Sequence, residues 1–428
     1  MTDGANGRVR EAWTLGAAGG GAAAADRFDR QRRVAGWDQA RLERAHVLVA
    51  GAGAIGNEAA KLLALLGIGR ITIVDMDRIE RSNLARTVLF REDDVGRPKA
   101  EVAAERVREL APGARVEAIA GDVERDIGLG RVREADAILG CLDNLHARVA
   151  LNRAAQRARR PWIDAAIDAR ALEVAAFVPG GACYECALGE RAWQRYRRRY
   201  SCGEGLVRAA AEGKVATVST VASLAAALQV EALLALLHTR GGGACPGSPL
   251  FGLSPGERLF FSLEPLLLAR RAIARVPDCF AHEPWPDPVV SPLSRRASLA
   301  DVAAHLERER TQAGARVAAL ALGFDLVVRL ACAACRTTEA PLVPRGRLTR
   351  VEGLCPSCRA DRTVECVQEV GIDGELARLP LGRLGVPDRD ILRLRTAGAA
   401  GAAAGAEDIF VELAPEVLEG DEDRRSLS

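Results

Sequence analysis

The chain has 428 residues, 49% of them apolar, which is enough for two or three domains including one large α/β unit. Its 59 basic and 57 acidic side chains nearly cancel, so composition excludes a global attraction to nucleic acid or to an anionic membrane. Residues 1–25 are rich in glycine and alanine and lack a compact apolar segment. We therefore expect a disordered tail without a secretory signal, and a cytoplasmic protein.

From residue 26 onward, short apolar runs alternate with helical patterns. Strands are predicted over Ala45–Ala50, Arg70–Val74, Arg115–Ala120, Ala137–Gly140 and Pro161–Ile163. Helices are predicted over Asn57–Leu66, Ala100–Leu110 and Ala147–Arg159. This alternation predicts an α/β fold with a Rossmann-like, doubly wound and mainly parallel sheet.

One apolar stretch, Ala216–Leu237, is long enough to be mistaken for a membrane span. It contains Gln229 and Glu231, and small residues dominate it. We interpret it as a buried core helix, and we expect no membrane association.

The last third of the chain is predicted to form smaller units. Glu283–Pro292 has the proline-rich composition of a linker, and an amphipathic helix is expected over Ser298–Arg310. A cysteine-bearing segment follows, in which Arg345–Val351 and Thr363–Glu369 are predicted to be β-rich. Leu379–Ala414 suggests a small βαβ-like or hairpin end.

The turn after the first predicted strand carries a nucleotide-binding pattern, GAGAIG, from Gly51 to Gly56. In this G-x-G-x-x-G spacing Gly51 allows the tight turn, Gly53 lets phosphates approach the backbone, and Gly56 permits close helix packing. Asp75 ends the second strand, where a carboxylate can accept hydrogen bonds from ribose hydroxyls. The pattern alone indicates a nucleotide or dinucleotide, and NAD(P)-dependent oxidoreductases share it.

Two further stretches separate these options, because a hydride-transfer enzyme does not need them. They are RSNLAR, from Arg81 to Arg86, and GRPK, from Gly96 to Lys99. Together with RFDRQ, from Arg27 to Gln31, they resemble in order the motifs of the ThiF/MoeB superfamily, which includes the ubiquitin-activating enzymes. The resemblance extends to about His282, which is about 60% of the chain.

The resemblance implies roles for individual residues. Asp75 would hold the ribose, and three polar side chains would contact the triphosphate, namely Asn83, Arg86 and Lys99. Asp143 would hold Mg²⁺ near the α-phosphate. Arg30 resembles an arginine that family dimers insert into the neighbouring site, so a homodimer is implied. Taken singly, these side chains are also compatible with solvated charges or a turn, but their occurrence together and in order favours the site.

Eleven cysteines are many for such a chain, and paired cysteines in an intracellular α/β protein indicate metal ligands more often than disulfides. Cys183 and Cys186 resemble the family's first zinc pair. Where the second pair is expected, the chain has Cys279 and His282. A Cys₃His zinc site is therefore predicted, with an exposed linker histidine as the alternative for His282.

A second metal site is predicted from spacing alone. Cys332 and Cys335 are followed after 19 residues by Cys355 and Cys358, which is typical of a structural zinc ribbon. Few aromatic residues and no dense basic stripe accompany it, which favours a stabilising or protein-docking role over nucleic-acid binding.

Cys202 differs from these pairs because no second cysteine lies near it. In the family, a cysteine at this place can become a thioester, acyl-disulfide or persulfide carrier. Three arginines precede it and would lower its thiol pKa: Arg197, Arg198 and Arg199. The alternative is an ordinary loop cysteine. The remaining cysteines are expected to be inert: Cys141, Cys245 and Cys366.

These observations lead to one functional hypothesis, ATP-dependent adenylation of the C-terminal carboxylate of a ubiquitin-like or sulfur-carrier protein, with a later transfer to Cys202. Adenylation of a peptide or small acid, an oxidoreductase, and a non-catalytic zinc scaffold are the alternatives. The predicted division is a tail (1–25), a ThiF-type adenylation domain with a zinc site (26–285), a linker and short helix (286–323), a zinc-ribbon-like domain (324–371) and a small C-terminal element with a polar tail (372–428).

Overall fold

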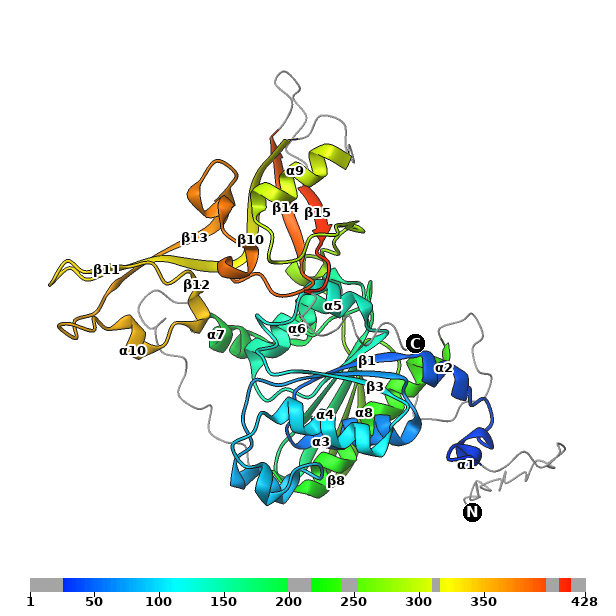
Figure 1. Cartoon of the computed structure of the whole chain (residues 1–428). Coiled ribbons are helices and arrows are strands. Elements are labelled where there is room, and N and C mark those ends of the chain that lie inside the picture. The colour runs from blue at the N-terminus through cyan, green and yellow to red at the C-terminus, as the bar shows by residue number, and fades with distance from the viewer. Residues whose placement is uncertain (1–25, 199–216, 240–252, 310–315, 398–407, 417–428) are drawn as a thin grey trace, which may run out of the picture.

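The computed structural model describes residues 26–198, 217–239, 253–309, 316–397 and 408–416. Within them two β-sheets form the framework, and Figure 1 shows the smaller sheet above the larger one. The larger sheet has eight strands in the order β3-β2-β1-β4-β5-β6-β7-β8.

The first five strands of this order are parallel, as predicted from the alternating pattern. They are β1 (His46–Ala50), β2 (Arg70–Val74), β3 (Arg115–Ile119), β4 (Ala137–Gly140) and β5 (Trp162–Ile167). The other three extend the sheet as antiparallel strands: β6 (Ala171–Phe177), β7 (Glu257–Leu263) and β8 (Leu266–Ala272). The predicted α/β, mainly parallel fold is confirmed, whereas this antiparallel extension was not predicted.

Helices cover both faces of the sheet because successive strand residues point to opposite sides. On β1, Val47 and Val49 pack with α3 (Ala54–Leu66), α4 (Lys99–Leu110) and α8 (Ser219–Thr239). Leu48 and Ala50 pack on the other face with α5 (Leu129–Glu134) and α6 (Leu145–Arg157). The sheet is thus doubly wound.

Helix α8 is long and apolar enough to cross a membrane by length and composition, but it belongs to the core. Gln229, at its centre, is buried and donates hydrogen bonds to the carbonyls of Gly140 (3.0 Å) and Ile163 (2.8 Å). These bonds fasten the helix across β4 and β5. The interpretation of this stretch as a core helix is confirmed.

The smaller sheet is built around the long strand β10 (Arg316–Ala331). Its path runs β11-β10-β14-β15-β9, and β12 and β13 also pair with β10. The partners are β9 (Val289–Val290), β11 (Thr338–Glu339), β12 (Val343–Pro344), β13 (Thr363–Gly371), β14 (Ile391–Ala397) and β15 (Asp408–Glu412). Helix α9 (Leu299–Glu309) packs its apolar side against this sheet.

One predicted element of this region is wrong. The segment Arg345–Val351 is not β-rich, because a 3₁₀ turn (Arg345–Arg347) and the start of the short helix α10 (Arg350–Gly353) occupy it. Thr349 and Glu352 form a reciprocal capping box at the start of α10, and these local hydrogen bonds favour the helical turn. The helix near Ser298–Arg310, the strand near Thr363–Glu369 and a terminal hairpin, β14–β15, are confirmed.

Strand pairing crosses the predicted domain boundaries. Strand β9 lies in the segment predicted as linker, and β10 begins at Arg316, before the predicted ribbon domain. Both belong to the same sheet as the terminal hairpin. The division into domains stays a prediction.

Candidate nucleotide site and metal centres

The glycine turn between β1 and α3 is closely packed on one side and open on the other. Gly51 has φ +98°, and a Cβ there would lie 2.4 Å from the carbonyl oxygen of Cys141. A Cβ at Gly56 would lie 1.9 Å from the carbonyl oxygen of Gly51. A Cβ at Gly53 would meet nothing within 4 Å. The open side lies at the start of α3, where backbone N–H groups favour an anion.

An acidic and a basic side chain lie beside this turn. Asp75 follows β2, and its carboxylate accepts hydrogen bonds from the backbone N–H groups of Ala52 (2.7 Å) and Asp77 (2.8 Å). Burial raises the pKa of Asp75, while the charge of Lys99 lowers it. The Nζ of Lys99, a buried side chain, lies 2.9 Å from Oδ2 of Asp77. Asp75 and Lys99 are therefore both at the turn, as the family resemblance implies.

The loop with the RSNLAR motif is linked to the turn through Asn57 of α3. The Asn57 side chain accepts from the Leu89 N–H (3.0 Å) and donates to the Ala52 carbonyl (2.7 Å). In the loop, Oδ1 of the buried Asn83 accepts from the Glu80 N–H (2.9 Å). Nη1 of Arg86, which is half-buried, donates to the carbonyl of Ser82 (2.7 Å). Asn83 thus shapes the loop with its amide oxygen.

Asp143 reaches the same edge of the sheet from β4. The backbone N–H of Cys141 donates to the Ala50 carbonyl (2.8 Å), and the Cys141 carbonyl faces Gly51. Asp143 is exposed two residues later, and Asn144 caps α6 by accepting from the Ala147 N–H (2.8 Å). An exposed carboxylate beside an open phosphate cradle fits Mg²⁺, which prefers oxygen ligands.

Arg30 lies away from this cluster. It is exposed on α1 (Asp29–Arg32), and the neighbouring Gln31 donates to the carbonyl of Leu65 at the C-terminal end of α3 (3.0 Å). The glycine turn is at the opposite end of this 13-residue helix, about 20 Å away at 1.5 Å per residue. Arg30 is therefore not part of its own chain's nucleotide site. Cys202, with Arg199, lies outside the described residues, as does Cys245.

The predicted Cys₃His ligands form one cluster. The sulfur of Cys183 lies 3.7 Å from those of Cys186 and Cys279, and Nε2 of His282 lies 3.3 Å from Cys186 Sγ. Tetrahedral zinc with bonds of about 2.3 Å to sulfur requires sulfur separations of about 3.8 Å, so the four residues fit zinc. Burial and the charge of Arg275 lower the pKa of His282, which favours the neutral, metal-binding imidazole.

The four ribbon cysteines also come together. Sulfur separations are 3.5 Å for Cys332–Cys358, 3.4 Å for Cys335–Cys355 and 3.8 Å for Cys335–Cys358. Each pair closes a similar turn, in which Arg336 or Arg359 has a left-handed backbone with φ near +60°. The geometry fits a second tetrahedral zinc, and the site lies at one end of β10 and β13.

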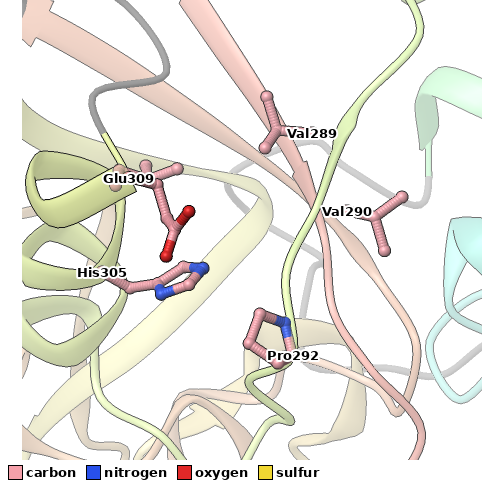
Figure 2. A pocket seen from close by; sticks show the side chains of 6 residues that line it. Val289, Val290, Pro292, His305 and Glu309 are labelled. Carbon is pink, nitrogen blue, oxygen red and sulfur yellow. The ribbon is translucent and has the colours of Figure 1, made fainter.

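A separate small pocket of about 270 Å³ lies on the second sheet (Figure 2). Val289, Val290 and Pro292 line one side of it, and His305 and Glu309 from α9 face them. Every predicted site residue lies outside this lining.

Comparison with known proteins supports the family resemblance that the motifs indicated. The family model described as ThiF family matches residues 28–250, just over half of the chain. Protein HesA of Leptolyngbya boryana is 30% identical over 268 residues, which cover 61% of this chain and 87% of that protein.

Two shorter matches carry functional names. The SAMP-activating enzyme E1 of Haloferax volcanii is 38% identical over 36% of this chain, and the sulfur carrier protein adenylyltransferase of Thermus thermophilus is 39% identical over 38% of it. The chain spans 56% and 63% of the lengths of these two relatives.

Proposed function

Because the chain belongs to the ThiF family, we propose that it uses ATP to adenylate the C-terminal carboxylate of a ubiquitin-like or sulfur-carrier protein. The observation that carries the proposal is that Asp75 and Lys99 lie at the open glycine turn, with Asp143 two residues after the Cys141 carbonyl that faces Gly51. The name of the Thermus relative supports the choice of substrate.

In the proposed reaction a carboxylate oxygen of the substrate attacks the α-phosphorus of ATP. The bond from this phosphorus to the β-phosphate oxygen breaks, and pyrophosphate leaves with the electron pair, so no protein nucleophile is needed. Charge grows on phosphate oxygens, and Lys99 as a point charge and Arg86 as a planar fork would stabilise it. Asp143 would hold Mg²⁺, which neutralises further phosphate charge when bound.

Asp77 has a part in this scheme that the motifs did not indicate. Its carboxylate is paired with the buried Lys99, which orients the ammonium group at the edge of the turn. Burying an ammonium group without a partner is unfavourable, so Asp77 would hold Lys99 in place until the triphosphate binds.

The remaining parts of the proposal concern assembly and later steps. We include a homodimer, because Arg30 is too far from its own site to act there. We also propose that the Cys202 thiol then attacks the adenylate, forming a thioester with release of AMP. We further propose zinc in both cysteine clusters, a cytoplasmic location, and no binding to nucleic acid or membranes. Peptides or small acids remain alternative substrates. An oxidoreductase would leave Lys99 and Asp143 without a role.

ATP–pyrophosphate exchange with candidate carrier proteins tests the proposal. We expect Asp143→Ala to lower exchange by about 100-fold or more, because the charge on the α-phosphate is no longer neutralised. Cys202→Ala should keep exchange within about twofold of wild type and lose only the later transfer. Asp373→Ala, which removes an exposed carboxylate from the turn after β13 of the second sheet, is the matched control.

Three outcomes would contradict parts of this scheme. Equal loss of exchange in the folded Asp143 and Cys202 variants would show that the two steps are not separate. Exchange that needs no carrier would identify a small acid as substrate. NAD binding without exchange would identify an oxidoreductase.

A further inference from the structure

Arg148 is a largely but not fully buried cation that the proposed reaction does not use. It lies on α6, one turn after the Asn144 cap, and only 16% of its side chain is exposed. Its Nη2 donates hydrogen bonds to the carbonyls of Leu142 (2.6 Å) and Ala165 (3.3 Å). Burying a guanidinium is unfavourable unless it is paired, so its partners indicate what holds it there.

The first of these partners is Asp164 on β5. Nε of Arg148 lies 3.2 Å from Oδ1 of Asp164, which is 5% exposed and packs against Gly140 of β4. Burial raises the pKa of Asp164 to about 6, although Arg148 lowers it. The pair contacts the loop that leads from β4 to Asp143, through the Leu142 carbonyl and Gly140.

The second partner comes from the Cys₃His cluster. Tyr184 lies between Cys183 and Cys186, and its backbone N–H donates to Oδ1 of Asn152 (3.0 Å). Its ring packs against Trp162 and Phe177, and its hydroxyl interacts with the Arg148 guanidinium, which acts to lower the pKa of the tyrosine against the effect of burial. Burial opposes the charged form of Arg148, but Asp164 and Tyr184 outweigh it and raise the arginine pKa. One guanidinium thus touches β5, the cysteine turn and the loop before Asp143.

The loop depends on this contact because, among the described residues, Asp143 has only one weak side-chain contact of its own. Its carboxylate is exposed, and Asn144 Nδ2 lies 3.4 Å from Oδ1, a long hydrogen bond. The direction of the carboxylate is therefore set by the backbone, and the Leu142 carbonyl, in the preceding residue, is fixed by Arg148.

We infer that Arg148 is a positioning residue for Asp143, and that the Tyr184 hydroxyl connects it to the cysteine–histidine cluster. The inference rests on the proposed function, since it concerns the residue that would hold the divalent cation. It assigns the Cys183–Cys186 turn a second role besides stability, which is to hold the guanidinium at a fixed position relative to the nucleotide site.

The variant Arg148→Lys tests the inference, because lysine keeps the charge but cannot reach Asp164 and the Leu142 carbonyl with one rigid fork. The full chain is titrated with Mn²⁺ in the presence of ATP, and Mn²⁺ binding is followed by electron paramagnetic resonance. We expect the apparent Mn²⁺ dissociation constant to rise by about tenfold or more. ATP binding without a divalent cation should stay unchanged.

Two further variants separate positioning from general damage. Tyr184→Phe removes only the hydroxyl, and we expect the same constant to rise by about threefold while zinc content is kept, in line with one lost polar interaction with a charged group. Arg157→Lys is the matched control, since Arg157 is also on α6 but lies over the Trp285 ring, 5.1 Å from its centre. It should leave Mn²⁺ binding unchanged.

Wild-type Mn²⁺ affinity in the folded Arg148 and Tyr184 variants would overturn the inference and leave the proposed function intact. If Arg148→Lys does not fold, Tyr184→Phe decides alone, and a wild-type constant in it overturns the proposed link. Failure of the wild-type protein to catalyse exchange with any carboxylate would instead overturn the proposed function.

Discussion

Gly53 and Gly56 lie on the same turn but have different surroundings. The backbone of Gly53, at φ −74° and ψ −154°, is open to any residue, and a Cβ there would point into empty space. A Cβ at Gly56 would collide with the Gly51 carbonyl. The fold therefore needs glycine at position 56, whereas a bound phosphate would need it at position 53.

This difference predicts opposite outcomes for two alanine variants. Gly53→Ala should weaken ATP binding by about tenfold or more and lower the free energy of unfolding by less than about 1 kcal/mol, since alanine is a poorer helix N-cap than glycine. Gly56→Ala should lower the free energy of unfolding by about 3 kcal/mol through overpacking. Nucleotide titration and urea unfolding measure both. Equal destabilisation by the two variants would contradict the assigned roles.

From the sequence, site residues could be identified where they belong to motifs. Residues that only tertiary packing brings together could not be identified. The position of Asp75 could be predicted from the end of its strand, and those of Lys99 and Asp143 from the family motifs that they resemble, while their roles stay predictions. Arg148 could not, because its partners Asp164 and Tyr184 come from β5 and from the cysteine turn. The only local signal was an aspartate within the apolar strand WIDAAI.

At the scale of elements, buried parallel strands were easier to predict than exposed antiparallel ones. Strands β1 to β5 are short apolar runs that alternate with helices, which is a strong pattern. Strand β8, LLLARRA, has largely exposed side chains and does not alternate between apolar and polar positions. No local pattern indicated that β7 and β8 would extend the sheet beyond β6.

Strand β1 also contains a group that makes stability depend on pH. His46 is 6% exposed, and its Nε2 lies 2.9 Å from Oγ1 of Thr72. Burial, helped by the charge of Arg70, lowers the pKa of His46 from 6.5 to about 4. Between these values the unfolded chain binds more protons than the folded one. The stabilisation is thus complete above pH 6.5 and is lost as the pH falls toward 4.

We therefore expect His46→Gln to flatten the pH profile of stability. Between pH 7 and pH 5, the wild type should lose about 2 kcal/mol more of its free energy of unfolding than the variant does. Urea unfolding at several pH values measures this difference in slope, which is independent of any uniform destabilisation by glutamine. Parallel profiles would show that His46 does not cause the dependence.

At the scale of the whole molecule, α5 joins the two sheets. Nη2 of Arg131 lies 2.7 Å from Oδ2 of Asp388, and Nη2 of Arg133 lies 2.6 Å from Oε2 of Glu412. The backbone of Asp388 passes so close to α5 that a Cβ at Gly128 would lie 2.2 Å from its carbonyl oxygen. Ile391 of β14 completes the apolar contact. The sheets are therefore joined by ion pairs and by close backbone packing.

The variant Gly128→Ala tests this junction. Its methyl group should separate the sheets, so that the smaller sheet unfolds at a lower temperature than the larger one in scanning calorimetry. Gly113→Ala, whose Cβ would meet nothing within 4 Å, is the control and should keep the wild-type profile. A wild-type profile for Gly128→Ala would mean that the junction can accommodate a side chain.

The two cysteine clusters predict a metal content. Metal analysis after gel filtration should find two zinc ions per chain, and one in either Cys183→Ser or Cys355→Ser. The Cys355 variant should keep ATP–pyrophosphate exchange, because its cluster lies on the second sheet. A content of two zinc ions in either variant would contradict the ligand assignment.

The central claim is that a carboxylate attacks the innermost phosphorus of ATP at the glycine turn. It is tested most directly by incubating the protein with a carrier ending in Gly-Gly and ATP labelled at either the α- or the γ-phosphate. The claim predicts that, in the Cys202→Ala variant, which should keep the adenylate, the α-label becomes attached to the carrier and the γ-label appears only in pyrophosphate, and that adding Asp143→Ala abolishes both. Appearance of the γ-label on the carrier or in inorganic phosphate would contradict it.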